Sequence, residues 1–309
     1  MTLRNIRLGF VISYILNKSM NPRMAERISE IKNDKVHGAG WLAQQAINTL
    51  TLAITESRQK DVAGFIHEIK SLSEELVKAR PSMVSIANYI NQFSHDIRER
   101  EENNKDLKSL KAWAEARGTE LVELSEKATE RVIEYGGGII STTDTIISCS
   151  YSSTVCASLE LAKDNEEKFH VMVAASKFQD KAYGEITASE LKQHGIPAEV
   201  ISDESMPSCI ARADKAIIGA DSILADGSLI NGMPSLALAQ AAREVDIPFF
   251  AVCETAKFDI QGYIARVPKL ESGLEKVPAN LITGIITEKG IMAPGMIKAY
   301  MAEMARSFK

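Results

Sequence analysis

Cysteine, histidine and long apolar runs are all scarce in this 309-residue chain, and each scarcity excludes a class of protein. No two of the four cysteines form a CxxC pair, and no group of cysteines and histidines has the spacing of zinc ligands. The chain therefore does not match a disulfide framework or a zinc site, and we expect reduced, mostly buried thiols in an intracellular protein. The five histidines are dispersed, so we predict no metal site, and we expect no cofactor.

The chain also lacks a strong excess or a long block of charge of one sign. Its net charge is −5, with 25% charged and 45% hydrophobic residues, which is ordinary for a globular protein. Proteins that bind nucleic acid usually carry a basic patch, so we expect no direct contact with nucleic acid. The sequence contains neither the G-x-S-x-G elbow of serine hydrolases nor the GxxxxGK(S/T) phosphate loop.

An apolar run at residues 8–16 follows Arg4 and Arg7 and faintly imitates a signal peptide. The run is too short to span a bilayer, and no small-residue cleavage site follows it. Two interpretations stay open. The run is a secretion signal, or the natural start of the protein is Met20 or Met24 and residues 1–23 are an N-terminal extension. We favour a cytoplasmic protein with no membrane partner.

Residues 24–135 are predicted to form a helical domain, because apolar side chains recur there at helical spacing. The first predicted helix begins near residue 24 and breaks at Asn33-Asp34. The others are expected over 40–56, 62–79, 83–93 and 105–134. The charged segment 96–108 is interpreted as a solvated helix face or a connection.

Residues 136–309 change pattern after a run of three glycines, and short apolar runs then alternate with helical segments. Strands are predicted at 139–148, 169–175, 198–202, 215–218, 249–253 and 281–287, and helices at 153–164, 183–194, 205–213 and 233–245. This alternation predicts an α/β protein in which the helical N-terminal domain precedes a Rossmann-like, doubly wound parallel sheet. Ligands of such sheets bind at the carboxyl ends of the strands.

One such strand end is the segment 148–155, where a β-branched run gives way to a cluster of hydroxyl side chains. Ser152, Ser153 and Thr154 are candidate N-caps of the following helix. A helix start with free N–H groups and nearby hydroxyls binds anions such as phosphate. An ordinary strand-to-helix turn with a serine cap is the alternative.

Asp221 stands at another strand end, after an apolar run and a glycine. A carboxylate that is partly desolvated there would have a raised pKa and could act as a general acid or base. The alternative is a loop aspartate that caps a helix. The segment 223–232 predicts a hairpin with an Asp-Gly turn, which would return Asn231 to the side of Asp221.

Two further segments are candidates for ligand contacts. Gly38, Ala39 and Gly40 match the start of a dinucleotide fingerprint, but the preceding residues are polar and contain no strand. We therefore predict a glycine-bearing helix start that approaches the other domain. Arg80, at a helix boundary before a proline, could clamp a phosphate or carboxylate, or could be a surface arginine.

The order of these segments resembles the translation initiation factor 2B family, from about residue 24 to 305. That family contains the alpha, beta and delta subunits of the factor and isomerases of methylthioribose-1-phosphate and ribose-1,5-bisphosphate. The motifs that carry the resemblance are 37–40, 79–82, 148–155, 218–223, 226–231, 252–257 and 285–290. The resemblance implies a helical domain before a Rossmann-like domain, and dimers or hexamers assembled through the latter.

The resemblance also implies which residues would be catalytic. The isomerases use an aspartate that matches Asp221 and a cysteine whose position falls on Ser150, while Cys149 replaces a histidine. A serine hydroxyl is a far weaker acid than a thiol. Two further family residues, an arginine and a lysine, are replaced by His37 and Gly232. The residues retained from the same set are Arg80, Asp221 and Asn231.

These replacements favour a catalytically silent, factor-2B-like protein, closer to the regulatory subunits than to the enzymes. Its expected partner is the alpha subunit of translation initiation factor 2 or a related factor-2B subunit. The pocket would still bind a sugar phosphate or a nucleotide. The alternative is an aldose-ketose isomerase in which Cys149 replaces the missing thiol, although neighbouring residues of a strand face opposite ways. A nucleotide-metabolism enzyme acting on another phosphosugar is a third class.

Overall fold

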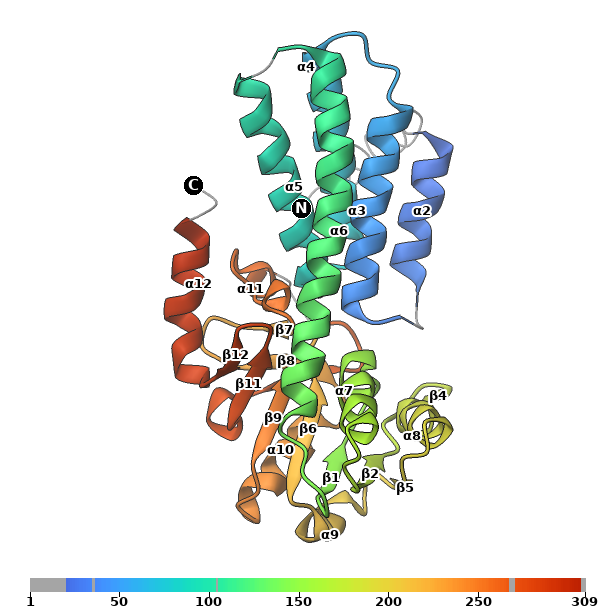
Figure 1. Ribbon diagram of the computed structural model, residues 1–309, viewed down its shortest axis with the longest axis vertical. Helices are drawn as coiled ribbons and strands as arrows, with labels where there is room; N and C mark the ends of the chain where they lie inside the picture. Colours follow the sequence, from blue (N-terminus) through green and yellow to red (C-terminus); the bar gives the residue numbers. More distant parts are fainter. Residues whose placement is uncertain (1–20, 35–36, 104, 267–269, 307–309) are drawn as a thin grey trace, which may run out of the picture.

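The computed structural model describes residues 21–34, 37–103, 105–266 and 270–306 (Figure 1). Of the predicted N-terminal extension over residues 1–23, the structure describes residues 21–23, and the others lie outside the described residues. Below, the helical part means the described residues of 22–137, and the sheet part means those of 138–306. The predicted α/β fold class is confirmed.

The helical part is a bundle of roughly parallel and antiparallel helices (Figure 1). Its helices are α2 (Pro22–Asn33), α3 (Ala39–Glu56), α4 (Val62–Ala79), α5 (Val84–Asn103) and α6 (Leu107–Gly137). Aspartate side chains cap two of the starts, because Asp61 accepts from the Gly64 N–H and Asp106 from the Ser109 N–H. The helix α4 has the predicted bounds and stops before Pro81, as a proline requires of the residue before it.

The helix α5 is longer than predicted, because it continues through the charged segment to Asn103. Ile90, Phe93 and Ile97 recur on one face of α5 and are almost fully buried. The charged residues occupy the opposite face, so they remain helical while they are solvated. Asp96 also bonds Arg117 of α6 at 2.7 Å, which fastens this end of α5 to the bundle.

The helix α6 extends from the bundle to the sheet (Figure 1). Val132 near its end lies in the apolar core that covers one face of the sheet. A Cβ at Gly136 would lie 2.5 Å from the Ser158 Oγ of α7 (Ser153–Asp164), so only a glycine permits this approach. The predicted domain boundary at residue 135 therefore falls inside the last turn of a helix that both parts share.

The main sheet has seven strands in the order β12-β11-β9-β6-β1-β2-β5. Their bounds are β1 (Thr145–Ser148), β2 (His170–Ala174), β5 (Ala198–Ile201), β6 (Lys215–Gly219), β9 (Phe249–Val252), β11 (Gly284–Thr287) and β12 (Gly290–Met292). All pairs are parallel except β11 with β12. The strand order reverses between β1 and β6, and doubly wound sheets bind ligands at such a reversal.

Helices cover both faces of the sheet, and successive strand residues alternate between the two apolar cores. Ile146 and Ile217 pack with α7 and α8 (Tyr183–Gln193), whereas Ile147 and Ile218 belong to the opposite core. That opposite core contains residues of α9 (Met206–Cys209), α10 (Ser235–Glu244) and α12 (Ile297–Arg306). The doubly wound prediction is confirmed.

Several predicted elements are shorter in the structure; thus β11 begins at Gly284 and not at 281, and α10 spans only Ser235–Glu244 of the predicted 233–245. The strand expected over 139–148 begins only at Thr145, because the preceding residues form turns in which Asp144 accepts from the Ser141 N–H and Thr143 has φ 77°. The helix expected over 205–213 is α9 followed by a 3₁₀ turn, Ile210–Arg212.

The predicted Asp-Gly hairpin is present as β7 (Ser222–Ile223) and β8 (Leu229–Gly232). Gly227 in its turn has φ 81°, a conformation that favours glycine. The strand β10 (Leu274–Val277) adds a third strand to this small sheet. A second small hairpin joins β3 (Lys177–Phe178) to β4 (Lys181–Ala182).

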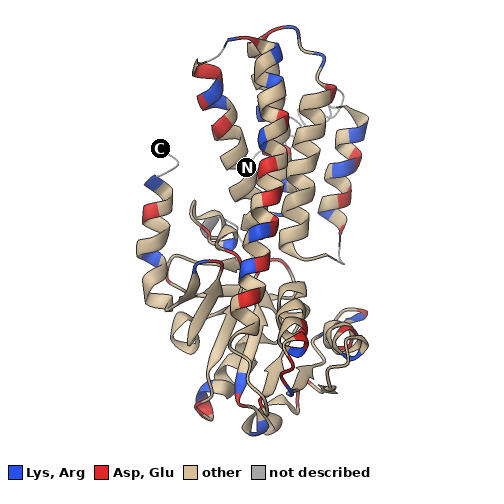
Figure 2. Cartoon of the chain, in the orientation of Figure 1, with Lys and Arg blue, Asp and Glu red and all other residues tan. Residues whose placement is uncertain are grey.

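Acidic and basic residues alternate along the outer helices (Figure 2). The interior strands of the sheet are largely uncharged in the same view. In the part of the chain that the structure describes, no helix is both long and apolar enough to cross a membrane.

Candidate ligand-binding site

Two adjoining cavities open where the bundle meets the carboxyl ends of the central strands. We call the first the lysine chamber because it contains Lys257, and its volume is about 210 Å³. We call the second the arginine chamber because it contains Arg80, and its volume is about 200 Å³. Asp221 and Asn231 line both chambers, so the two cavities form one site.

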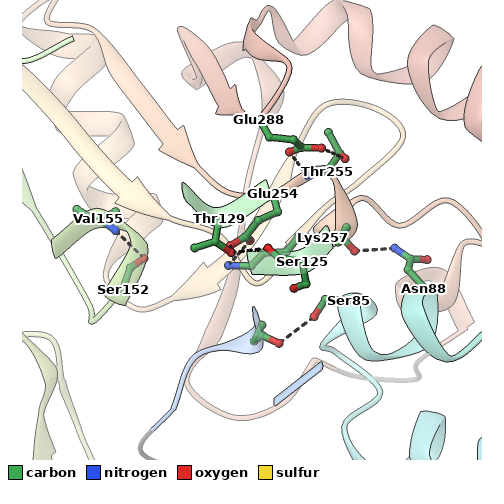
Figure 3. Close-up of polar contacts among 12 residues, drawn as sticks. Ser85, Asn88, Ser125, Thr129, Ser152, Val155, Glu254, Thr255, Lys257 and Glu288 are labelled. Carbon is green, nitrogen blue, oxygen red and sulfur yellow. Dashed lines mark hydrogen bonds and ion pairs between the residues drawn. The ribbon is translucent and has the colours of Figure 1, made fainter. Parts of the chain in front are cut away.

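Two helix starts meet at the lysine chamber. Ser152 caps α7 by accepting from the Val155 N–H at 3.3 Å, and Gly38 is the N-cap of α3 with no side-chain cap (Figure 3). A Cβ at Gly38 would lie 3.6 Å from the Ser153 Oγ, so the two starts are in contact. The positive ends of both helix dipoles therefore lie at this chamber, which favours an anion.

The predicted hydroxyl cluster and glycine segment both line the lysine chamber: Gly38, Ala39, Gly40, Ser152, Ser153 and Thr154. The structure thus brings together two segments that are more than 100 residues apart in sequence. Ser85 of α5 donates to the Ala39 carbonyl at 3.2 Å and fixes the start of α3 (Figure 3).

A buried ion pair forms the floor of the lysine chamber. Lys257 and Glu254 are only 6% and 5% exposed, and Nζ lies 3.5 Å from Oε2. Burial opposes both charges, but the neighbouring carboxylates raise the pKa of Lys257 and the Lys257 ammonium lowers the pKa of Glu254. Both residues are therefore charged, and Thr129 of α6 donates to Glu254 Oε1 at 3.0 Å (Figure 3).

Asp221 follows β6 at the centre of the site. Its N–H donates to the Ile230 carbonyl at 2.9 Å, which fixes the carboxylate beside the hairpin. Burial raises the pKa of Asp221, although Lys257 and Arg80 act in the opposite direction. A carboxyl group with a raised pKa is suited to proton transfer.

Asn231 lies across from Asp221, as the hairpin predicts. It is 7% exposed, and its Nδ2 donates to the Ser235 Oγ at 2.9 Å. This bond fixes the amide on the shared wall of the two chambers, where it can orient a hydroxylated ligand.

Ser150 lines the arginine chamber in a constrained conformation. Its φ is 62°, which is uncommon for a residue other than glycine. The Ser176 Oγ accepts from its N–H at 2.7 Å, and Thr187 donates to its carbonyl at 2.9 Å. A Cβ at Gly232 would lie 2.6 Å from the Ser150 Oγ, so the hydroxyl occupies space that a side chain at 232 would need.

Cys149 faces away from the site, as strand alternation predicts. It is 2% exposed, belongs to the apolar core, and lies 3.4 Å from the Ser235 Oγ through its Sγ. Burial raises the pKa of Cys149 to about 12. The structure therefore does not bring this weak catalytic candidate to either chamber.

Arg80 is held inside the site and is not a surface arginine. Its side chain is 16% exposed, and Nη1 donates to the Asp34 carbonyl at 2.8 Å. Nε lies 4.0 Å from Glu271 Oε2. Nearby, His37 Nδ1 lies 2.8 Å from Asp34 Oδ2, and its ring stacks on Trp41 at 3.8 Å.

The sequence reasoning missed Glu254, Lys257 and Thr129 as site residues. The first two belong to a segment on which the family resemblance rests, but charged residues beside a strand end usually lie at the surface. The packing of helices of the bundle, among them α3, α5 and α6, against that segment buries them.

The chain can be compared with known proteins at this point. The sequence profile of the Initiation factor 2 subunit family matches residues 35–275. A putative translation initiation factor eIF-2B subunit 2-like protein of Pyrococcus horikoshii is 32% identical, over 88% of this chain and 97% of the relative. A ribose 1,5-bisphosphate isomerase of Thermococcus kodakarensis is 27% identical, over 87% of this chain and 90% of that enzyme.

The crystal structure of the translation initiation factor eIF-2B of Pyrococcus horikoshii OT3 has the same fold, with a TM-score of 0.75 and 29% identity. The match covers 89% of this chain and 98% of the other. The relatives thus include both factor-2B-like proteins and sugar-phosphate isomerases. The chain belongs to the initiation factor 2 subunit family.

Proposed function

We propose that this chain is a translation initiation factor 2B subunit-like protein without isomerase activity. The observation that carries the proposal is the position of the thiols. The family resemblance implies that Ser150 falls at the position of the isomerases' cysteine, and no cysteine is among the described residues that line either chamber.

Chemistry supports this interpretation. An aldose-ketose isomerisation moves a proton between neighbouring carbons and needs a group that gives up and regains a proton. Asp221 provides one such group, but the serine hydroxyl opposite cannot act as the second acid or base near neutral pH. The thiol of Cys149 cannot replace it, because it lies in the core on the other face of the strand end.

The same site is suited to a phosphorylated small molecule. The proposed phosphate position is the lysine chamber, between the starts of α3 and α7 and beside Lys257. Asn231 and Asp221 would bind the hydroxyl groups of a sugar in the adjoining space. We propose a sugar phosphate or a nucleotide as a regulatory ligand.

The proposed protein partner is the alpha subunit of translation initiation factor 2 or a related factor-2B subunit, in a homodimer or hexamer of this chain. The support is the similarity to proteins named as factor-2B-like. Purified chain and purified factor-2 alpha subunit should form a complex at low salt in analytical ultracentrifugation. Failure to do so at micromolar concentrations would remove the partner from the proposal.

The second candidate function is a sugar-phosphate isomerase, which the retained residues Arg80, Asp221 and Asn231 favour. We expect no turnover of ribose 1,5-bisphosphate or methylthioribose-1-phosphate by the wild type. Turnover that Asp221→Asn abolishes would establish the isomerase and overturn the silent interpretation. Ser150→Cys is the informative companion variant, because it restores a thiol at the position of the family's cysteine.

A further inference from the structure

The segment that carries Lys257 is held by both parts of the molecule. Asn88 of α5 donates through Nδ2 to the carbonyls of Ala256 and Phe258, each at 2.7 Å. Thr129 of α6 bonds Glu254, the ion-pair partner of Lys257. On the sheet side, Glu288 accepts from the Thr255 N–H at 2.9 Å (Figure 3).

Lys257 therefore has two competing uses. Its ammonium either neutralises the buried Glu254 carboxylate or attracts an anion in the lysine chamber. A buried carboxylate that loses its donors is strongly destabilised, so each hydrogen bond to Glu254 reduces its dependence on Lys257. Thr129 is the side-chain donor to Glu254 that comes from the helical part.

The Thr129 hydroxyl has two acceptors but only one proton. Its Oγ1 lies 3.0 Å from Glu254 Oε1 and 3.0 Å from the Ser125 carbonyl one turn earlier in α6. A small movement of α6 can therefore redirect the Thr129 O–H from the Ser125 carbonyl of its own helix to Glu254, or back. Such a hydroxyl is sensitive to the position of α6 over the sheet.

We propose that Thr129 and Glu254 are positioning residues for Lys257, through which the helical part sets the affinity of the lysine chamber for a phosphorylated ligand. This inference rests on the proposed ligand function of that chamber. Coupling is reciprocal, so a bound anion that engages Lys257 also changes the bond between Glu254 and α6. Ligand occupancy would thereby be transmitted to the helical part.

The test is isothermal titration of inorganic phosphate into the full chain and three variants. Thr129→Val has nearly the same shape but no donor, so Glu254 should draw Lys257 away and weaken phosphate binding about fivefold or more. Thr129→Ser keeps the hydroxyl and should stay within about twofold of the wild type. Glu254→Gln removes the competing charge and should strengthen binding.

The two variants distinguish a positioning role from a merely structural one, because phosphate binding should weaken in Thr129→Val and strengthen in Glu254→Gln. Damage to the fold would weaken binding in both. Hydrogen exchange gives a second readout: phosphate should slow exchange around residues 125–132 in the wild type but not in Thr129→Val. If the wild type binds phosphate and Thr129→Val binds it equally well, the positioning role is wrong and the ligand site stands. If the wild type binds no phosphate, the ligand site and this inference both fall.

Discussion

Charge at the level of single residues supports the proposal that the pocket binds anions, although it lacks two residues of the family pattern. The resemblance places an arginine and a lysine where this chain has His37 and Gly232. Lys257 remains, buried and charged, beside Asp221. In the proposed site, anion binding and proton chemistry would therefore depend on different residues, and the loss of one need not remove the other.

Replacing Lys257 by methionine separates its structural role from its binding role. The substitution leaves the buried Glu254 carboxylate without its cation, which should lower the free energy of unfolding by about 3–5 kcal/mol. Phosphate affinity should fall at least tenfold, because the cation at the floor of the chamber is gone. Urea unfolding and calorimetric titration measure the two effects.

The matched control is the double variant Lys257→Met with Glu254→Gln. It removes both charges, so most of the lost stability should return while phosphate binding stays weak. Recovery of phosphate binding in this double variant would show that Lys257 is not the anion contact.

Because Asp221 is buried, its ionisation should make the free energy of unfolding depend on pH. Burial raises the pKa of Asp221 in the folded protein above its unfolded value of about 3.9. The stabilising contribution of Asp221 is therefore present below about pH 3.9 and is lost as the pH rises through the folded pKa. Asp221→Asn should therefore be more stable than the wild type at pH 7. The difference should vanish as the pH falls below about 4.

Asp226 provides a control of opposite sign for this experiment. Although burial opposes it, hydrogen bonds from Ser228 and Lys276 lower the pKa of Asp226 to about 2. Asp226→Asn should thus be slightly less stable than the wild type at pH 7, and the deficit should shrink as the pH falls below about 4 toward that value. Thermal melts between pH 2.5 and pH 7 measure both variants. A gain in stability at neutral pH for both would show that desolvation is not the cause at Asp221.

At the level of elements, close approach of helices to the sheet edge builds the site. The helix α8 begins against the end of β2, where a Cβ at Gly184 would lie 2.0 Å from the Ala174 carbonyl oxygen. From this position Thr187 on α8 reaches the Ser150 carbonyl. The constrained turn at Ser150 therefore depends on the position of α8 against β2.

Gly184→Ala should displace α8, because the added methyl group meets backbone that cannot rotate away. We expect a loss of about 1–3 kcal/mol in the free energy of unfolding. Gly295→Ala is the matched control: no atom lies within 4 Å of its added Cβ, and its effect should stay within about 0.5 kcal/mol. Equal melting temperatures for the two variants would contradict the close packing of α8.

The elements that sequence predicted best are those whose pattern is local. The helices α4 and α7 have their predicted bounds because caps, a proline and helical periodicity mark both ends. The short strands β10 and β12 were not predicted, since pairing with another strand, not an apolar run, defines them: β10 pairs with the distant β8, and β12 with the neighbouring β11. Sequence also could not show that α5 continues, because its buried face only appears against the neighbouring helices of the bundle, α3, α4 and α6.

The same distinction holds for the site. Asp221 and Asn231 were predictable, because the carboxyl ends of parallel strands and a tight hairpin fix where such side chains lie. The ion pair of Lys257 with Glu254 was not, because its burial results from the packing of separate elements, among them α3, α5 and α6, on the segment after β9. A pattern within one segment carries no information about that packing.

At the scale of the whole molecule, the ligand site and α6 both join the helical part to the sheet part. Each chamber is lined by residues from both parts. The helix α6 ends against α7, with Gly136 at the point of closest approach. We therefore expect the two parts to unfold together.

The chain carries natural reporters for this expectation. Both tryptophans, Trp41 and Trp113, lie in the helical part, and all four cysteines lie in the sheet part. Tryptophan fluorescence thus follows one part, and the reaction of the buried thiols of Cys149, Cys156 and Cys253 follows the other. In a urea titration the two midpoints should coincide, as in a cooperative transition.

Gly136→Ala should break this coincidence, because its methyl group would meet the Ser158 Oγ and push α6 from α7. The thiol transition, which reports the sheet part, should then move to lower urea than the fluorescence transition, since the bundle keeps its own core while the sheet loses a covering helix. Gly295→Ala again serves as the control and should leave the midpoints together. Separate midpoints already in the wild type would mean that the parts fold independently, and coincident midpoints in Gly136→Ala would mean that the ligand site, not α6, couples them.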